Sequence, residues 1–280
     1  MINQQTTQDK DSSRPIGPCY RNNMNKVTCD KISDWLSTYL EKNSLSSFVI
    51  GVSGGVDSAV VSTLCARTGK PTIVLNIPIN SKQTHTNMSV KHCAWLKENF
   101  SNVTVHNIDL SSVYSTFRTT LDGTLEVNEL AYANTKSRLR MTLLYQFATT
   151  FNGLVAGTGN KVEDFGVGFY TKYGDGGVDI GPIADLSKTQ VRQLAILLGV
   201  DRAIVNAAPT DGLWEDDRTD EEQIGASYEE LEWAMDYVDN SGTTSPTARQ
   251  KEVLDIFNGY RVRNSHKMNP IPIFTLEENK

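Results

Sequence analysis

The sequence predicts an α/β fold, with a doubly wound, mostly parallel sheet and helices on both of its faces. The main observation is that short apolar runs alternate with longer segments whose apolar residues recur every three or four positions. Such alternation is typical of βαβ units, whose strands run parallel. No internal repeat and no Pro-rich or Gly-rich linker divides the chain. We therefore expect a single domain over residues 27–280, preceded by a polar and mobile tail over residues 1–26.

The individual elements can be assigned in order along the chain. The first helix shows a stripe of apolar side chains at helical spacing, and the last begins at a capping Ser187 and ends at Gly199. Helices are predicted over residues 27–45, 57–68, 84–100, 129–151 and 187–198. Strands are predicted over residues 47–53, 72–77, 103–108 and 153–157. Ligands of such sheets bind beyond the carboxyl ends of the strands, so we expect the functional residues in the loops that follow them.

Composition excludes several classes of protein. The chain has 280 residues, 39% of them hydrophobic and 21% charged, which is ordinary for a globular domain and not for a disordered or fibrous one. A net charge of −6 argues against a general nucleic-acid binder. Its four cysteines form no Cys-x-x-Cys pair, so structural zinc is not expected. No apolar run is long enough for a membrane span and no signal peptide is apparent, so we expect a cytoplasmic protein.

The loop after the first predicted strand has the features of a phosphate-binding turn. Residues 51–58 read Gly-Val-Ser-Gly-Gly-Val-Asp-Ser, and the helix that follows directs its positive end toward the same point. Two adjacent glycines let backbone N–H groups approach an anion closely. The spacing is not that of a Walker loop or of a dinucleotide fingerprint. Asp57 is the unusual residue of this loop: it fits either a Mg²⁺ ligand beside the phosphates or a simple helix cap.

Three further segments carry candidate functional groups. Lys136, Arg138 and Arg140 alternate along a predicted helix, which by itself is most simply a solvated basic face. The strand ending near residue 157 is followed by Thr-Gly-Asn-Lys-Val-Glu, which supplies Thr158 and Glu163. Residues 169–179 form a glycine-dense loop with interleaved charges. Such a loop is either a mobile excursion or a binding lid, and its density of functional groups favours the lid.

These motifs together resemble a known family. The 51–58 loop resembles that of the N-type ATP pyrophosphatases, which cleave ATP between the α- and β-phosphates. The string Phe-Tyr-Thr-Lys-Tyr-Gly-Asp-Gly-Gly-Val-Asp over residues 169–179, with residues 182–188, 208–213 and 266–267, is similar to the ammonia-dependent NAD synthetases. The resemblance runs from about residue 27 to the end of the chain. It implies a Rossmann-like fold of the adenine nucleotide alpha hydrolase type.

The resemblance also implies a reaction, the last step of NAD biosynthesis. The nicotinate carboxylate of deamido-NAD would attack the α-phosphate of ATP and release pyrophosphate, and ammonia would convert the acyl adenylate to NAD and AMP. The enzyme would be a carbon–nitrogen ligase and a homodimer, because in this family the substrate site straddles two subunits. Positioning and charge would do most of the work, since the substrate supplies the nucleophile.

Site residues follow from the same resemblance, position by position. Mg²⁺ would bind Asp57 and Glu163. The expected catalytic residues are Asp57, Lys188 and Asp175, the last on chemical grounds alone, as a carboxylate that could help deprotonate ammonium. Deamido-NAD would contact Arg138, Lys172, Asp179, His266 and Lys267. ATP would contact a larger set, which comprises Gly51, Val52, Ser53, Gly54, Gly55, Val56, Asp57, Ser58, Arg140, Thr158, Lys188 and Thr210.

The chain departs from the family pattern in the length of the segment between Glu163 and Lys172, and two further departures concern polar residues. Asn76 stands where the family often has a basic residue, and residues 209–213 read Pro-Thr-Asp-Gly-Leu where Pro-Thr-Ala-Asp-Leu is commoner, so a carboxylate role there shifts to Asp211 or is absent. The chain has no room for the amidohydrolase domain of glutamine-dependent relatives, so free ammonia is the expected nitrogen source. Alternatives are another adenylating pyrophosphatase, such as a GMP synthetase-like or tRNA-modifying enzyme, and a non-catalytic adenine-nucleotide-binding regulator.

Some residues have a plain structural interpretation. Cys65 lies in a predicted helix and is expected in the core, and His85, His92 and His106 are expected to be surface or structural residues. The acidity of the chain is concentrated in residues 211–240, which hold twelve Asp and Glu against one basic residue, Arg218. We expect this segment to be a solvated loop and helix. The remaining 250 residues carry a net +5, enough cations for two small polyanions.

Overall fold

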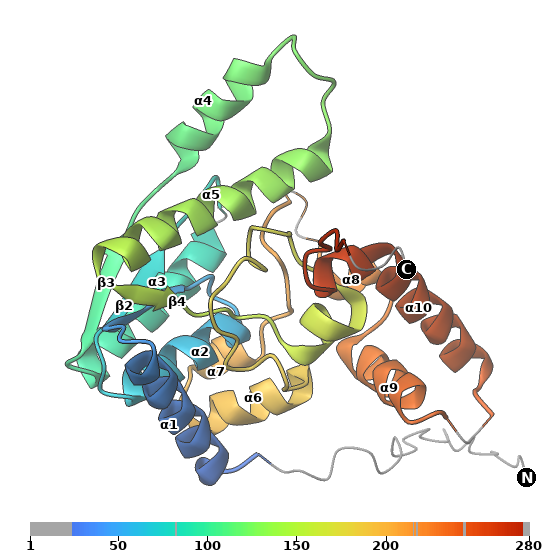
Figure 1. Ribbon diagram of the computed structural model, residues 1–280, viewed down its shortest axis with the longest axis horizontal. Helices are drawn as coiled ribbons and strands as arrows, with labels where there is room; N and C mark the ends of the chain where they lie inside the picture. The colour runs from blue at the N-terminus through green and yellow to red at the C-terminus, as the bar shows by residue number, and fades with distance from the viewer. Residues whose placement is uncertain (1–23, 82, 215, 217, 243–244, 277–280) are drawn as a thin grey trace, which may run out of the picture.

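A four-stranded parallel sheet forms the centre of the computed structural model, which describes residues 24–276 except 82, 215, 217 and 243–244 (Figure 1). Most of the predicted tail, residues 1–23, lies outside the described part. The strands are β1 (Ser47–Gly51), β2 (Thr72–Asn76), β3 (Val103–Asn107) and β4 (Gly153–Val155), in the order β3-β2-β1-β4. The predicted doubly wound parallel sheet is confirmed.

The order of the strands places the ligand edge. β1 pairs in parallel with β2 on one side and with β4 on the other, so that Phe48 lies opposite both Thr72 and Leu154. The chain moves outward from β1 to β3 and then returns to the other side of β1. The direction of winding therefore reverses between β1 and β4, and the loops that leave these two strands diverge to open a crevice. A parallel bridge between Ala156 and Ile180 extends the β4 side of this edge.

The five predicted helices are all present, and their ends differ from the expectation by no more than three residues. The structure also contains several helices that were not predicted from periodicity, including a short π-helix, η1. The described helices are α1 (Lys26–Lys42), α2 (Val56–Arg67), α3 (Gln83–Asn99), α4 (Ser111–Leu121), α5 (Glu129–Thr150), η1 (Val162–Val167), α6 (Lys188–Leu197), α7 (Arg202–Val205), α8 (Asp220–Ile224), α9 (Tyr228–Asp239) and α10 (Ala248–Met268).

Alternation along the strands sorts the helices into two layers. Phe48 and Ile50 of β1 pack with α1, α2 and α6, whereas Val49 between them packs against α5 on the opposite face. Figure 1 shows α5 crossing one side of the sheet and α1, α2 and α6 covering the other. Cys65 lies fully buried in the first of these layers, as expected. Among the described residues, no helix has both the length and the apolar character that a bilayer span requires.

The C-terminal part of the chain forms a second apolar cluster beside the sheet. It is built from η1, α8, α9 and α10, and Tyr228 and Phe257 are its largest fully buried side chains. The expectation that residues 211–240 are a solvated loop and helix is therefore wrong in part. Two helices of this segment bury one face, because α9 is amphipathic and packs against both η1 and α10. Even two of its acidic side chains, Asp220 and Glu232, are buried.

Candidate active site

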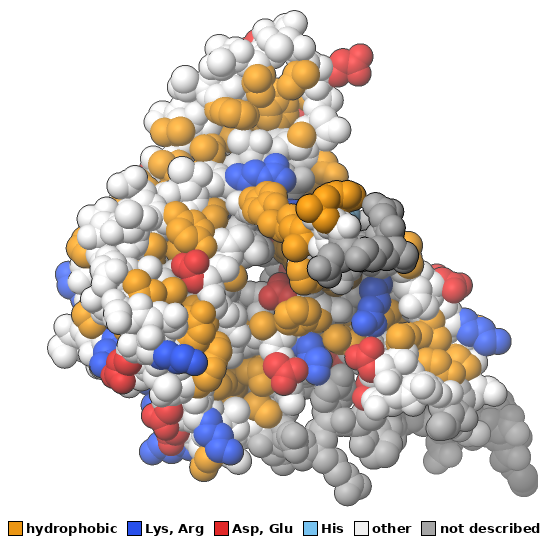
Figure 2. All heavy atoms as spheres, in the orientation of Figure 1, with side chains coloured by type: hydrophobic (Ala, Val, Ile, Leu, Met, Phe, Trp, Pro, Cys, Tyr) orange, Lys and Arg blue, Asp and Glu red, His pale blue; other side chains and the backbone are white. Residues whose placement is uncertain are grey.

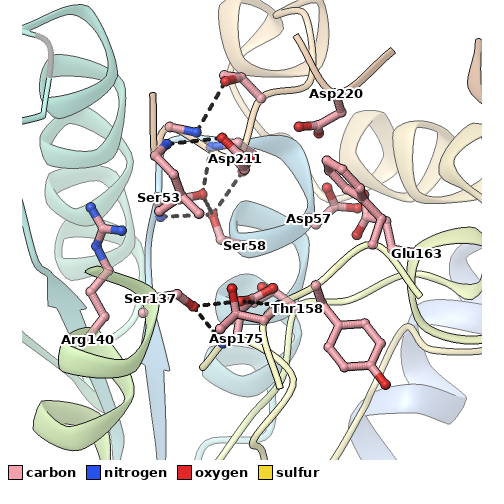
Figure 3. Close-up of a pocket in the computed structure, with 18 of the residues that line it drawn as sticks. Ser53, Asp57, Ser58, Ser137, Arg140, Thr158, Glu163, Asp175, Asp211 and Asp220 are labelled. Atoms are coloured by element: carbon pink, nitrogen blue, oxygen red, sulfur yellow. Dashed lines mark hydrogen bonds between the residues drawn. The ribbon is translucent and has the colours of Figure 1, made fainter. Parts of the chain in front are cut away.

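One large cavity of about 920 Å³ lies at the carboxyl edge of the sheet, where the loops after β1, β2 and β4 meet. The loops over residues 168–178 and 207–214 and the end of α10 complete its wall. Of the residues that the sequence singled out for the site, all but Asp179 line this cavity. Figure 3 shows the 53–58 turn in the middle of the site, with Arg140 on one side and the carboxylates of Asp57, Glu163 and Asp220 on the other.

The phosphate-type loop is held in shape by its own serines. The Ser58 hydroxyl donates to the Gly55 carbonyl at 3.0 Å and accepts from the Ser53 backbone N–H at 3.2 Å. The Gly55 N–H donates to the Ser53 hydroxyl at 3.2 Å, and the two hydroxyls lie 3.1 Å apart. Gly54 has φ +92°, a left-handed conformation that favours glycine. These bonds fix the turn, and α2 begins directly at the cavity wall.

Asp57 is not the cap of α2. The cap position is Gly55, which has no side chain, and Asp57 lies one position inside the first turn. Its carboxylate instead contacts the ammonium of Lys188, with Oδ2 2.5 Å from Nζ. The same Nζ donates to Oε1 of Glu163 at 3.2 Å. We call Asp57, Lys188 and Glu163 the acid–lysine triad. Its side chains are only 3% (Lys188) and 16% (both acids) exposed.

Lys188 and Glu163 each lie near the start of a helix. Lys188 is the first residue of α6, which begins with the predicted Ser187 cap and a reciprocal capping box to Gln190. Glu163 stands in η1, a π-helix that ends at Gly168 with φ +62°. The sequence expected Glu163 in a loop directly after the strand. A π-turn is rare and has no periodicity signal of its own, and it occurs frequently at functional sites.

Electrostatics within the triad favour a charged lysine. Burial alone would lower the pKa of Lys188, but the carboxylates of Asp57 and Glu163 outweigh it and raise that pKa above its ordinary value. Burial raises the pKa of Glu163, against the opposing effect of Lys188, and raises the pKa of nearby Asp220 to about 7. A single ammonium thus faces more carboxylates than it can neutralise, and this end of the cavity attracts further cations.

The donor set of the triad fits Mg²⁺. Lys188 contacts one oxygen of each carboxylate, and among the described residues the other oxygens have only long contacts to Asn160, at 3.4 Å for Asp57 and 3.5 Å for Glu163. In the described part of the chain, no group of three or more His, Cys, Asp and Glu side chains is arranged to hold a metal ion. Two hard oxygen ligands suit a Mg²⁺ ion that takes the rest of its shell from water and phosphate.

Basic side chains line another part of the cavity wall. We call Arg138, Lys172, His266 and Lys267 the basic rim. Nε of Arg138 donates to the Lys172 carbonyl at 3.2 Å, Nζ of Lys172 to the His266 carbonyl at 3.0 Å, and Nζ of Lys267 to the Tyr170 carbonyl at 2.7 Å. The rim thereby joins α5, the 169–179 loop and α10. Arg138, Lys172 and Lys267 thus donate to neutral carbonyls and keep their charge available for an anion.

Arg140 lies deeper than the basic rim. Its Nε donates to the Ile77 carbonyl at 3.0 Å, at the end of β2. Burial lowers the pKa of this guanidinium to about 10, so it stays charged at neutral pH. Lys136, about one helical turn earlier in α5, is buried too: its Nζ donates to the Leu213 carbonyl at 2.9 Å. The simple interpretation of a solvated basic face is therefore wrong for this helix, except at the exposed Arg138.

The 169–179 loop is tied to α5 and β4. Asp175 accepts from the Ser137 hydroxyl at 2.6 Å, and the Thr171 hydroxyl donates to Asn134 at 2.6 Å. Asp179 accepts from Tyr145 and from the Val155 backbone N–H, both at 2.8 Å. The loop is a wall of the cavity rather than a mobile excursion. Asp179 anchors this wall and does not line the cavity, so its expected contact with deamido-NAD stays a prediction.

The two departures from the family pattern at polar residues have structural explanations. Asn76 is buried, and it donates to Asn107 at 3.1 Å and accepts from the Ser89 hydroxyl at 2.7 Å, so it cross-links β2, β3 and α3. Asp211 lines the cavity, but its carboxylate accepts from the Leu213 N–H at 3.0 Å and from the Gln223 amide at 3.3 Å. It therefore shapes the 210–214 turn. Thr210 accepts from the Gly212 N–H in the same turn.

Sequence reasoning missed the contribution of α8 and α9. Tyr228 donates to Glu163, and Asp220 lies behind it, yet both belong to the segment that was expected to be solvated. A signal was available: Thr219-x-x-Glu222 and Ser227-x-x-Glu230 are capping boxes, both formed in the structure, and they mark the starts of these helices. The expectation for the histidines is confirmed at His92, which is buried against Ser62; the side chain of His85 lies outside the described residues.

Comparison with known proteins gives a consistent picture. A family model described as NAD synthase matches residues 28–270. An NH(3)-dependent NAD(+) synthetase of Archaeoglobus fulgidus is 35% identical over 249 residues, which cover 89% of this chain and 97% of that protein. A protein of the same name from Methanococcoides burtonii is 37% identical over 203 residues, 72% of this chain and 76% of that one.

Solved structures agree with the sequence relatives. The NMN synthetase of Francisella tularensis superimposes with a TM-score of 0.79 at 31% identity, over 90% of this chain and 98% of that one. An NH3-dependent NAD synthetase of Campylobacter jejuni, at 23% identity and a TM-score of 0.72, shares the fold. The expected Rossmann-like fold of the adenine nucleotide alpha hydrolase type is confirmed. By its sequence over almost its whole length, the chain belongs to the NAD synthase family.

Proposed function

We propose that the protein is a ligase that amidates deamido-NAD to NAD, with ATP and free ammonia. The nicotinate carboxylate attacks the α-phosphorus of ATP and pyrophosphate leaves. Ammonia then attacks the carbonyl carbon of the acyl adenylate, loses a proton, and AMP leaves as NAD forms. The family match and the names of the relatives at 35% and 37% identity support this reaction.

One observation carries the proposal: a single cavity contains a phosphate-type loop, the acid–lysine triad and the basic rim. The first chemical step brings a carboxylate against a triphosphate, and two anions approach only where fixed cations offset their repulsion. Lys188 supplies such a cation at the buried end, and Arg140 another on the other side of the loop. The cavity, at about 920 Å³, is large enough for the reacting parts of both substrates.

Each group of residues has a role in this proposal. The 51–58 loop, Thr158 and Thr210 hold the ATP, and Arg140 and Lys188 neutralise its phosphates. Asp57 and Glu163 hold Mg²⁺, which when bound offsets phosphate charge and favours the departure of pyrophosphate. Asp175, fixed by Ser137, is placed to accept a proton from ammonium. The basic rim binds the phosphates of deamido-NAD.

A second candidate substrate is nicotinate mononucleotide. The solved structure at 31% identity and a TM-score of 0.79 is an NMN synthetase, which favours a test of the mononucleotide alongside the dinucleotide. Both substrates present the same nicotinate carboxylate to ATP, and so the chemistry at Lys188 is identical for the two. Discrimination falls to the part of the cavity that would bind the adenylate half, which is bordered by the basic rim.

We also propose a homodimer in the cytoplasm. Five large apolar side chains are 42–69% exposed on α4, the start of α5 and the loop between them: Val113, Phe117, Leu125, Val127 and Leu130. Figure 2 shows hydrophobic side chains gathered on this projecting lobe. A second copy that buries them would remove apolar area from water.

The proposed cytoplasmic location rests on the cysteines. Those that the structure describes are free and buried, which suits a reducing compartment.

The proposed reaction is tested by product analysis. Purified protein is incubated with Mg-ATP, ammonium and either deamido-NAD or nicotinate mononucleotide, and NAD, NMN, AMP and pyrophosphate are separated by chromatography. We expect NAD, AMP and pyrophosphate in equal amounts. NMN formed faster than NAD would assign the mononucleotide instead, and the absence of all products from folded protein would refute both assignments. A parallel incubation with glutamine in place of ammonium tests the nitrogen source, and equal yield there contradicts the use of free ammonia.

A further inference from the structure

Helix α9 presents two buried polar side chains to the acid–lysine triad. Tyr228 is its first residue and Glu232 follows four positions later, so both lie on the same face of the helix. Tyr228 is 0% exposed and Glu232 4% exposed. A phenol hydroxyl and a carboxylate are costly to bury unless they are hydrogen-bonded. Tyr228 bonds to Glu163 of the triad, and Glu232 to the backbone of Thr189, the residue after Lys188.

Tyr228 touches two members of the triad at once. Its hydroxyl donates to Oε1 of Glu163 at 2.5 Å, and its ring lies under the ammonium of Lys188, with Nζ 4.6 Å from the ring centre. The ring belongs to the apolar cluster of η1, α9 and α10, whose packing a phenylalanine would satisfy equally well. Packing therefore explains the ring but not the hydroxyl. The hydroxyl is explained by its contact with Glu163.

A buried carboxylate stands behind this hydroxyl. Oδ2 of Asp220, from α8, lies 3.2 Å from the Tyr228 oxygen, and Oδ1 of Asp220 is buried without a hydrogen-bond partner among the described residues. The hydroxyl is thus held between Glu163 and Asp220. Its position is fixed on both sides, and Glu163 gains a fixed donor although it stands in an irregular π-turn.

Glu232 acts on the other arm of the triad. Its Oε1 accepts from the backbone N–H of Thr189 at 2.9 Å, in the first turn of α6. Lys188 is the residue just before Thr189 and opens that helix. Helix α9 thus contacts both sides of the triad. It fixes the position of Glu163 through Tyr228, and the position of the start of α6, which carries Lys188, through Glu232.

We propose that Tyr228 is a positioning residue for the metal-binding carboxylate of Glu163, with α9 as the rigid element that aligns it with Lys188. This inference rests on the proposed Mg²⁺ role of Asp57 and Glu163. Lys188 pulls Oε1 of Glu163 toward itself, and the hydroxyl shares that same oxygen. The second oxygen, Oε2, is thereby turned away from the ammonium and kept available for the cation. Outer hydrogen bonds of this kind typically change metal affinity about 10–100-fold.

The test compares Tyr228→Phe with Tyr114→Phe. Tyr114 is a matched control because it is also buried, its ring also lies near a lysine ammonium (Lys136, 5.4 Å), and it does not line the cavity. Each variant is titrated with Mg²⁺ in the amidation assay. Binding of Mn²⁺ in the presence of a non-hydrolysable ATP analogue is measured by calorimetry without turnover. Thermal unfolding of the apo-proteins reports their packing.

We expect Tyr228→Phe to raise the half-maximal Mg²⁺ concentration and the Mn²⁺ dissociation constant about tenfold. Tyr114→Phe should change neither, and the two variants should lose similar thermal stability. An unchanged cation requirement in folded Tyr228→Phe overturns the proposal. If that variant does not fold, Asp220→Asn, which weakens the support behind the same hydroxyl, is expected to raise both constants, and no change there overturns it. Wild-type protein that binds Mn²⁺ with the analogue but forms no NAD or NMN would contradict the proposed function alone.

Discussion

The two ends of the cavity hold charge in different ways. At the buried end, the charged atoms of Lys188 contact those of Asp57 and Glu163 directly, and hardly any water reaches them. At the basic rim, Lys172 and Lys267 donate to backbone carbonyls and remain half-exposed. The charged groups of the buried end are therefore held in place before any ligand binds. The basic groups of the rim remain free to form ion pairs with a ligand. Interactions at the first end should decide the rate and those at the second the affinity.

The largest expected effect is at the buried end, with Lys188→Met. Removal of the ammonium leaves two carboxylates without their partner, and breaking a buried ion pair typically costs about 3–5 kcal/mol of folding stability. We also expect kcat to fall about a thousand-fold, because a fixed cation beside the phosphates is lost. Product formation and urea unfolding measure the two effects.

The matched control for this variant is Lys161→Met. Lys161 is paired with Asp185 at 3.0 Å on the surface, and it does not line the cavity. Exposed pairs of this kind contribute about 0–1 kcal/mol, so both stability and kcat should stay close to wild type. Equal losses of stability and of kcat in the two lysine variants would contradict the expected difference between buried and exposed cations.

A somewhat smaller effect is expected for Asp57→Asn. The amide keeps the shape of the side chain but removes the charge that faces Lys188 and the proposed Mg²⁺. We expect kcat to fall about a hundred-fold with the fold intact, as judged by circular dichroism. Asp185→Asn, on the exposed pair, is the control. Wild-type turnover in Asp57→Asn would reduce this aspartate to a structural partner of Lys188.

The rim should respond in KM rather than in kcat. Burial lowers the pKa of Lys267, but the side chain is half-exposed, so water screens much of its charge. We expect Lys267→Met to raise KM for the nicotinate substrate about tenfold, equivalent to about 1.4 kcal/mol, with kcat within about threefold. The effect should shrink at high salt. Lys251→Met, on an exposed part of α10 outside the cavity, should change neither constant. A fall in kcat alone would place Lys267 with the buried end.

The smallest expected effect concerns His92, which is buried away from the cavity and should change stability but not turnover. Burial lowers the pKa of His92 from 6.5 to about 4, and the ring is hydrogen-bonded to Ser62. Because the folded pKa lies below the unfolded one, the stability from neutral His92 is fully present above about pH 6.5. It is lost as the pH falls toward 4, by about 3 kcal/mol in all. His92→Gln should flatten the fall of the melting temperature over this range and leave kcat unchanged. An identical pH slope in both proteins would contradict the assignment.

The sheet and its nearest helices could be predicted from the sequence because their signals are local. Strands such as residues 72–76 are buried on both faces and therefore read as short apolar runs. Helix α1 shows the stripe of an amphipathic helix. Helix α10 was not predicted, since Val253 and Phe257 are its only fully buried residues among those described, and most of its side chains are polar. The acidic composition of α8 and α9 concealed that Asp220 and Tyr228 are buried.

The loop over residues 51–58 was determined by sequence alone, because its conformation depends on adjacent glycines and serines that bond to one another. The presence of Lys188, Glu163 and the rim lysines was evident too. Their arrangement was decided by the tertiary structure. Lys188 and Asp57 are 131 positions apart, and Tyr228 and Glu163 are 65 apart. Only the packing of α6 and α9 against the edge of the sheet brings such residues into contact, since the energy of a buried charge depends on neighbours that the chain order does not specify.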